Sequence, residues 1–402
     1  MSHEKLTPYP HQKKVESFQL YYIDTQHDLQ LMLDKIKNTP EIAVDIEFDR
    51  NRHHYGFSLC LIQIACDDSC YIIDPLQEGV DALSIKKLNP LWKVFENPAI
   101  IKIFHSPSED IRLLKTLNCY IKNIFDTHTA AQLTSTPTFS YKHLLETRLQ
   151  INLEKNEQTS DWKRRPLSPF QLQYAAKDVI YLFELKKILL QEVTSLHRLN
   201  WLQEELLHLE TLEIAETDNL HLRIKGAKDL TDLQRHQLKA LFDYRDKQAQ
   251  KLNKPPYQTI EDGILMALVE RPKDTIAQWT SLKRKHPRLQ NAIADIEALL
   301  QQAIQEAQAL GLSNRPYYPT QAEKQAALDR RDQLRRCKDF FKPIRDHIQQ
   351  QYGESIAALV LTVRIIEDFC WERYKLSHLK QYAQNIIRQA AADIGTDLSQ
   401  YE

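Results

Sequence analysis

Four acidic side chains are the residues of this 402-residue sequence best suited to chemistry: Asp45, Glu47, Asp110 and Asp178. Carboxylate oxygens are the ligands that hard divalent cations such as Mg²⁺ prefer. Two such cations side by side activate a water molecule and stabilise the leaving oxygen when a phosphodiester is hydrolysed. Four carboxylates roughly neutralise two divalent ions. We therefore predict metal-dependent phosphodiester chemistry, on the condition that the fold brings these residues together.

The first pair lies in a segment predicted to be a β-strand. Large apolar residues fall at positions 42, 44, 46 and 48, an alternation typical of a half-buried strand. Asp45 and Glu47 then share the opposite face, where their mutual repulsion raises a pKa unless a cation lies between them. The alternative for this pair, taken alone, is a solvated strand face.

The other two acidic residues are predicted to lie on helices. Asp110 follows an apolar, strand-like run and a Ser-Pro-Ser-Glu sequence that indicates a helix start, which places it in the first turn. Its alternative role is to complement the helix dipole. Further on, Ser168 as N-cap and Pro169 at the first helical position predict a helix that carries Tyr174 and Asp178 one turn apart. A phenol there can orient an attacking water, although the same spacing also occurs in plain packing.

Aromatic and cationic residues come together just before that helix. Trp162, Arg164 and Arg165 combine a ring that can stack on a base with guanidinium groups that can bind phosphate. We predict that this segment contacts the substrate near the scissile phosphate. The alternative is that Trp162 packs into the domain and the arginines are solvated. His105 is a further candidate for substrate binding, with a role in helix entry as its alternative.

Taken together, these motifs resemble those of ribonuclease D, in the tyrosine subclass of the DEDD superfamily of 3′-5′ exonucleases. The resemblance covers residues 19–210, and its motifs occur in the family's order and approximate separation. One departure is Ile46, where the family usually has Thr; this side chain points away from the predicted metal face. The residues that carry the resemblance are Val44-Asp45-Ile46-Glu47-Phe48, Asp110, and Asp161-Trp162…Arg165-Pro166-Leu167…Tyr174-Ala175-Ala176-Lys177-Asp178.

The resemblance implies a fold, a set of roles and a reaction. The implied fold is α/β, a ribonuclease H-like exonuclease domain with a mixed sheet, followed by an all-α helical half. Asp45, Glu47, Asp110 and Asp178 would hold two divalent ions, Mg²⁺ or Mn²⁺, and Tyr174 would position the nucleophilic water. The implied reaction releases nucleoside monophosphates from RNA 3′ ends, with tRNA precursors as the expected substrates.

The second half of the chain is predicted to be helical. Between Leu222 and Lys254, nine Lys or Arg stand against four Asp. Such an excess suits nucleic-acid binding, but it also occurs on solvated helix faces. The pattern of this segment is similar to the HRDC domain, a helical module that accompanies ribonuclease D and whose implied role is nucleic-acid binding. The residues that carry this similarity are Tyr244-Arg245…Ala249…Pro256…Ile260…Leu265.

We therefore expect four parts along the chain. The Arg-Asp pair at 245–246 recurs one hundred residues later at 345–346, which indicates a second, diverged HRDC-like copy. An unrelated helical bundle is the alternative, and Pro316–Pro319 is the expected linker. The expected ranges are 1–18 for a polar N-terminal segment, 19–210 for the exonuclease domain, 222–310 for the HRDC-like domain and 320–402 for a C-terminal helical domain.

Composition argues against several other classes of site. No two of the seven glycines lie within twenty residues of each other, which excludes a Gly-x-Gly-x-x-Gly turn or a P-loop, so we expect no nucleotide cofactor. The six cysteines form no Cys-x-x-Cys pair, which argues against a zinc site and fits reduced thiols. The sequence has no long apolar segment and no signal-peptide pattern after Met1, so we expect a cytoplasmic protein without membrane contact.

Two alternative functions stay open from the sequence. A 3′-5′ exonuclease acting on single-stranded DNA would need the same site, because the metal chemistry does not read the 2′-hydroxyl group. A catalytically silent RNA-binding scaffold would not need the site at all. The presence of all five chemical residues argues against such a scaffold.

Overall fold

The computed structural model describes residue 6 and residues 14–79, 81–134, 136–153, 160–213, 219–315 and 320–402. The chain divides into two compact units. The first unit comprises the described residues within 1–47, 59–214 and 323–402, and the second unit those within 48–58 and 215–322. The expected linker at 316–319 and most of the polar N-terminal segment lie outside the described residues.

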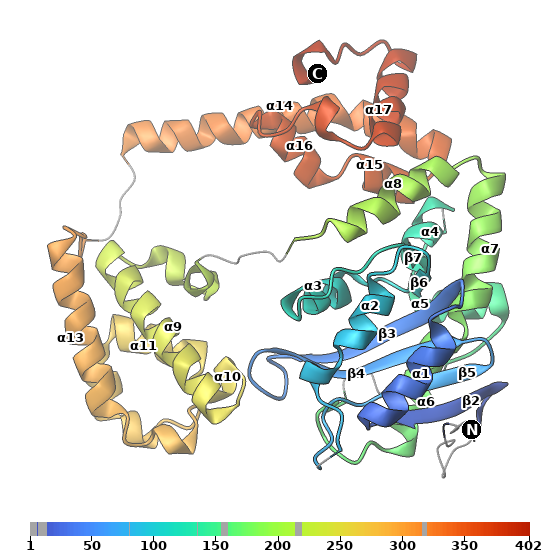
Figure 1. Cartoon of the computed structure of the whole chain (residues 1–402). Coiled ribbons are helices and arrows are strands. Elements are labelled where there is room, and N and C mark those ends of the chain that lie inside the picture. The colour runs from blue at the N-terminus through green and yellow to red at the C-terminus, as the bar shows by residue number, and fades with distance from the viewer. Residues whose placement is uncertain are drawn as a thin grey trace. The chain divides into compact units, whose positions relative to one another are not determined.

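A mixed β-sheet lies at the centre of the first unit (Figure 1). Within the described residues it has seven strands, in the order β1-β2-β5-β4-β3-β6-β7. Strands β3, β6 and β7 run parallel, as do β2 and β5, whereas β5 is antiparallel to β4. This mixed sheet confirms the predicted fold class. The strands are β1 (Lys14–Val15), β2 (Phe18–Ile23), β3 (Glu41–Arg50), β4 (Phe57–Cys66), β5 (Ser69–Ile73), β6 (Ile101–Phe104) and β7 (Ile124–Asp126).

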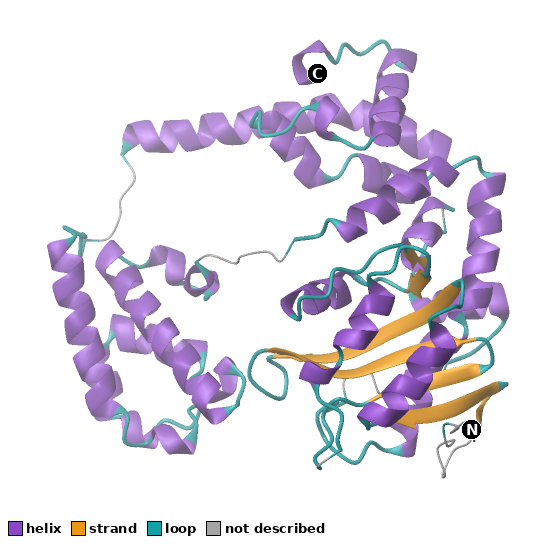
Figure 2. Ribbon diagram, in the orientation of Figure 1, coloured by secondary structure: helices purple, strands orange, loops and turns teal. Residues whose placement is uncertain are grey.

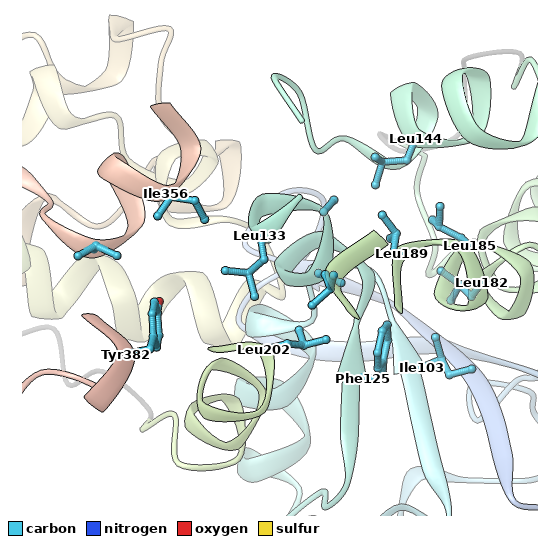
Figure 3. Close-up of a cluster of buried hydrophobic side chains, with 14 of the residues drawn as sticks. Ile103, Phe125, Leu133, Leu144, Leu182, Leu185, Leu189, Leu202, Ile356 and Tyr382 are labelled. Carbon is cyan, nitrogen blue, oxygen red and sulfur yellow. The ribbon is translucent and has the colours of Figure 1, made fainter. Parts of the chain in front are cut away.

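Helices pack around this sheet and share a hydrophobic core with it (Figure 3). Ile103 of β6 and Phe125 of β7 lie in the same buried cluster as Leu182, Leu185 and Leu189 of α7. The helices of this part of the chain are α1 (Gln26–Ile36), α2 (Asn89–Phe95), α3 (Ser108–Thr116), α4 (Thr127–Leu133), α5 (Tyr141–Leu144), α6 (Pro169–Ile180), α7 (Leu182–Ser195) and α8 (Leu199–Glu210).

Strand β3 forms as its sequence predicts. Ile42, Val44 and Ile46 are buried, while Asp45 and Glu47 are half-buried, which is the expected result of alternation on a pleated strand. The neighbouring small residue at position 43 is buried too, because the sheet is covered by packed side chains on both faces at this point. The strand therefore holds two acidic groups on a stiff, well-buried support.

The C-terminal helices belong to the first unit. Their apolar residues join the same core: Ile356 and Tyr382 lie in one cluster with Leu133 of α4 and Leu202 of α8 (Figure 3). The ring of Trp201 stacks on that of Tyr382, with centroids 5.3 Å apart. These helices are α14 (Gln321–Tyr352), α15 (Glu354–Val360), α16 (Val363–Cys370) and α17 (Gln381–Asp393).

The second unit is helical apart from the tip of the β3–β4 hairpin, and Figure 2 shows these helices in purple. The fully buried Trp279 is a large side chain in its core, and its indole nitrogen donates a hydrogen bond of 3.0 Å to the Leu289 carbonyl. In the hairpin tip, the Tyr55 hydroxyl donates to Asp246 at 2.7 Å. The helices are α9 (Asp232–Leu252), α10 (Pro256–Thr259), α11 (Asp262–Glu270), α12 (Pro272–Ala277) and α13 (Ile293–Ala309).

Among the described residues, none of the helices is both long enough and apolar enough to cross a bilayer.

Candidate active site

Strand β3 and helix α6 bring three of the four acidic residues together. Asp45 and Glu47 come from β3 and Asp178 comes from α6, and each offers one carboxylate oxygen. The three oxygens lie within 4.8 Å of one another. Oxygens that are this close can bind the same cation, so the strand and the helix together form one candidate metal site.

The local sequence of α6 sets where Asp178 lies. Ser168 is the N-cap, as predicted: its side chain accepts a hydrogen bond from the Gln171 backbone, and the Gln171 side chain accepts one from the Ser168 backbone. Pro169 occupies the first helical position. Tyr174 and Asp178 follow one turn apart, half-buried, and the phenol is hydrogen-bonded to the carboxylate. The cap thus fixes the start of the helix that orients both groups.

Helix α3 supplies the fourth acidic residue. It begins at Ser108, so that Asp110 lies in the first turn as predicted, although the N-cap is Pro107 and contributes no side-chain hydrogen bond. Asp110 is buried, with 7% of its surface exposed. Its oxygens are not part of the group within 4.8 Å, yet the charge of Asp45 acts on it and its own charge acts on Glu47. Asp110 therefore borders the three-residue cluster.

Burial raises the pKa of all four acidic groups, and repulsion adds to this effect in three of them. Burial raises the pKa of Asp45 to about 6. Burial also raises the pKa of Glu47 well above its ordinary value, and the charges of Asp45, Asp178 and Asp110 raise it further. The pKa values of Asp110 and Asp178 are raised for the same two reasons, burial first and the charge of Asp45 second. A proton on each carboxylate, or a cation beside it, therefore stabilises the folded site.

The donor set fits a hard divalent cation. All of its ligand atoms are carboxylate oxygens, which suit Mg²⁺, Mn²⁺ or Ca²⁺ better than zinc. Burial and mutual repulsion disfavour the four negative charges in the absence of a counter-charge, and a cation would remove that cost. The cluster is thus an oxygen-rich cation site by its chemistry as well as by its geometry.

Comparison with known proteins identifies the family. A family model described as a 3′-5′ exonuclease matches residues 20–194. The chain is 32% identical to ribonuclease D of Shewanella sp. (strain ANA-3) over 281 residues, which cover 69% of this chain and 70% of that protein. It is 34% identical to ribonuclease D of Xanthomonas oryzae pv. oryzae over 263 residues, which cover 63% of this chain and 70% of that protein. The chain belongs to the ribonuclease D family.

A solved structure agrees with this assignment at the level of the fold. The crystal structure of Escherichia coli RNase D aligns with a TM-score of 0.68 at 21% identity, and the alignment covers 94% of this chain and 99% of that one. Family membership and the matched exonuclease domain make this ribonuclease D family member a 3′-5′ exonuclease enzyme. The predicted resemblance is therefore confirmed.

Trp162 of this ribonuclease D family member is a packing residue. Its side chain is 3% exposed, and its ring lies 6.1 Å from that of Tyr174. The indole nitrogen is buried and has no hydrogen-bond partner within the part of the chain that is described. Trp162 therefore packs beside Tyr174, as in the packing alternative considered from the sequence. A contact between Trp162 and substrate stays a prediction.

The two neighbouring arginines differ in their surroundings. Arg165 bridges distant parts of the first unit: its guanidinium donates to the buried Asp74 carboxylate at 2.6 Å and to the Cys60 carbonyl at 2.9 Å. It also donates to the Trp162 carbonyl at 2.6 Å. Arg164 is exposed. Arg164 is thus the one whose charge faces solvent, and substrate contact by either arginine stays a prediction.

His105 directly follows β6. Its Nδ1 atom is 2.9 Å from the Thr127 hydroxyl oxygen, and that hydroxyl donates to the Phe104 carbonyl at 2.9 Å. The ring is also hydrogen-bonded to the Phe139 backbone, so it is held by partners on two segments of the chain. Burial lowers the pKa of His105 to about 4, so the ring is neutral near pH 7.

Tyr141 is a neighbour of the site that the sequence analysis did not identify. Its hydroxyl donates to the Lys177 carbonyl at 2.9 Å, and its ring centroid is 5.3 Å from that of His105. Burial raises its pKa above the ordinary value, and the charges of Asp178 and Asp45 add to the effect. Tyr141 lies on the four-residue helix α5, which is too short for a periodic pattern. The sequence therefore held no periodic pattern that would place Tyr141 beside the site.

Proposed function

We propose that this chain is a metal-dependent 3′-5′ exoribonuclease, which releases nucleoside monophosphates from RNA 3′ ends. The observation that carries the proposal is the group of three carboxylate oxygens within 4.8 Å, with Asp110 next to it. Family membership supports RNA as the substrate, since the relatives reported above are ribonucleases D by name. We further propose tRNA precursors as substrates and the cytoplasm as the place of action.

The proposed cofactors are two divalent ions, Mg²⁺ or Mn²⁺, held by Asp45, Glu47, Asp110 and Asp178. When bound, they would supply a polarised water and a counter-charge for the leaving oxygen. The protein's part is to hold four oxygen-bearing side chains on rigid elements, β3, α3 and α6, so that little reorganisation is needed.

Tyr174 is proposed to orient the attacking water. Burial raises the pKa of its phenol, and the Asp178 charge raises it further, so the hydroxyl keeps its proton at neutral pH. A protonated phenol that is hydrogen-bonded to a ligand carboxylate can hold a water beside that ligand. The packed ring of Trp162 restricts how far Tyr174 can move. We assign the positioning of the terminal nucleotide to the neutral His105.

The second unit is proposed to be an HRDC-like domain that binds the body of the RNA. Arg245, which belongs to the basic excess, is buried and paired with Asp262, so it serves the fold. Lys247 and Lys251 of the same helix are exposed, so their charges are available to phosphates. Residues 320–402 are proposed to be a second, diverged copy of the module.

Digestion of matched RNA and DNA tests the proposed function. A structured RNA with an unpaired 3′ tail and a single-stranded DNA of equal length are incubated with Mg²⁺ or Mn²⁺. We expect the wild type to shorten the RNA by one nucleotide at a time, and we expect Asp45→Asn to be inactive. Asp34→Asn is the matched control, because Asp34 is an exposed acidic residue of α1 and should behave as wild type.

The outcomes separate the proposal from its alternatives. Shortening of the DNA alone would identify a DNA exonuclease. Binding of the RNA without shortening, under both metals, would identify a silent scaffold. Equal activity of wild type and Asp45→Asn would show that the hydrolysis occurs elsewhere or comes from a contaminant.

A further inference from the structure

Four half-buried aromatic rings form a row beside the carboxylates. The rings are those of Phe139, His128, His105 and Tyr141, and each contacts the next. Ring centroids are 5.5 Å apart from Phe139 to His128, 5.6 Å from His128 to His105 and 5.3 Å from His105 to Tyr141. The catalytic roles proposed above use only His105 of this row.

The sheet fixes where the row begins. In the parallel pairing of β3 with β6, Ala43 is opposite Ile103, and Asp45 and His105 each follow two residues later along their segments. Tyr141 is the ring next to His105 in the row. Its hydroxyl donates a hydrogen bond to the carbonyl of Lys177, the residue before Asp178. The charges of Asp178 and Asp45 both act on Tyr141, so the inner end of the row is next to these two proposed metal ligands.

The rings are held in place by hydrogen bonds of the backbone and side chains around them. Asp126, at the end of β7, accepts from the Ser106 backbone at 2.8 Å and from the His128 backbone at 3.0 Å. This carboxylate thus joins the segment after β6 to the start of α4, the two places that carry His105 and His128. A row of rings held in this way loses little conformational freedom when a flat ligand stacks on it.

We propose that these four rings form a stacking surface for the unpaired bases of the RNA 3′ end as it enters the metal site. This inference rests on the proposed function. Every type of base can stack on an aromatic side chain, so such a surface does not depend on the RNA sequence. It therefore suits an enzyme that removes successive nucleotides. The inner rings, His105 and Tyr141, would contact the nucleotides nearest the scissile phosphate. The outer ring, Phe139, would contact a base further upstream.

Phe139 is the ring to test, because it lies outside the proposed catalytic machinery. We expect Phe139→Ala to raise KM for a 3′-tailed RNA about tenfold, as loss of one base–ring contact would. The kcat should change less than about twofold, because the reacting groups are untouched. The experiment is repeated with RNAs that carry a single abasic residue at successive positions from the 3′ end. At the position that stacks on Phe139, wild type and Phe139→Ala should have the same KM.

Further variants separate the loss of a base–ring contact from a general effect on folding. Phe139→Tyr should preserve the wild-type KM, whereas Phe139→Leu, which keeps an apolar group without a ring face, should resemble Phe139→Ala. Tyr120→Ala is the matched control: Tyr120 is 54% exposed and precedes β7, at the strand end opposite to the row. Its KM should equal that of wild type.

Two results would overturn the inference. An unchanged KM for Phe139→Ala is one; the other is a KM increase of equal size on every abasic RNA, which would indicate a structural effect. If the wild type shortens no RNA, the proposed function itself fails and the inference fails with it. Shortening by the wild type together with either of the first two results removes the inference alone.

Discussion

At the scale of single residues, the active site concentrates negative charge that the protein alone does not neutralise. Burial raises the pKa values of the four acidic groups, and repulsion raises those of Glu47, Asp110 and Asp178 further. Such an arrangement opposes folding at neutral pH, and it persists because function requires it. The stability of the protein should therefore report directly on occupancy of the site.

The metal-free protein is expected to lose stability as the pH rises from about 4 to about 6. Burial raises the folded-state pKa of Asp45 to about 6, above the value of roughly 4 in an unfolded chain. The unfolded state therefore loses its proton first, and the free energy of unfolding falls until the pH exceeds the folded-state pKa. Urea unfolding in the presence of a chelator measures this slope. It should be smaller in Asp45→Asn, and a wild-type stability independent of pH would contradict the prediction.

Tyr174→Phe should lower kcat by about 100-fold with little change in KM. The substitution removes only the hydroxyl that is bonded to Asp178, while the ring keeps its packing against Trp162. Steady-state kinetics on a short RNA, with thermal unfolding as the check on folding, measures both effects. A variant with wild-type kcat would mean that another group holds the water.

Arg165→Met should lower the free energy of unfolding by about 3–5 kcal/mol, because it leaves the fully buried Asp74 charge without its cation. Denaturant unfolding measures the loss. The adjacent, exposed Arg164 offers a matched control, since Arg164→Met should leave stability unchanged. If Arg165→Met instead keeps full stability and raises KM, the predicted substrate contact would be favoured over the structural role.

At the scale of elements, periodic patterns were predictable from the sequence and contacts between distant segments were not. The period-2 pattern placed Asp45 and Glu47 on one strand face, and a cap with a proline placed the start of α6. The bond between Arg165 and Asp74 joins residues that are 91 positions apart, and no local pattern encodes it. For the same reason, the sequence left open whether Trp162 is buried in the domain or exposed to the substrate.

Ser168→Ala tests the element that carries the catalytic pair. Loss of the N-cap should lower the free energy of unfolding by about 1 kcal/mol. It should also lower kcat, because Tyr174 and Asp178 depend on the position of α6. Thr25→Ala removes the N-cap of α1 and should cost similar stability without lowering kcat. Equal kcat values for the two variants would show that the capping box does not position the site.

At the scale of the whole molecule, the first unit is built from separated stretches of sequence. The helices from α14 to α17 share a core with the exonuclease helices, and Tyr382 and Lys380 of the C-terminal region both bond to Glu205 of α8. Sequence reasoning placed a helical domain at 320–402, but it gave no indication of what that domain packs on. Association between segments so far apart depends on side chains whose complementarity is visible only after folding.

A chain that ends at residue 213 should therefore aggregate. The truncation would expose Leu133 and Leu202, which are buried in the cluster that contains Ile356 and Tyr382. Size-exclusion chromatography and binding of a hydrophobic dye measure the effect. Deletion of 219–315 alone, with the ends joined by a long Gly/Ser linker, should leave a soluble protein. A monodisperse truncated chain would show that the C-terminal helices are dispensable to the core.

The discontinuous first unit also has a consequence for synthesis. On the ribosome, Leu202 emerges roughly 150 residues before Ile356, its partner in the buried cluster; at translation rates of about 5–20 residues per second this is a delay on the order of ten seconds. During that interval the sheet and its acidic cluster can form, while the apolar surface of α4 and α8 stays exposed because the C-terminal helices have not yet been made. We expect chaperones to bind the nascent chain in this interval, and the pace of translation through the second unit sets how long the apolar surface is exposed.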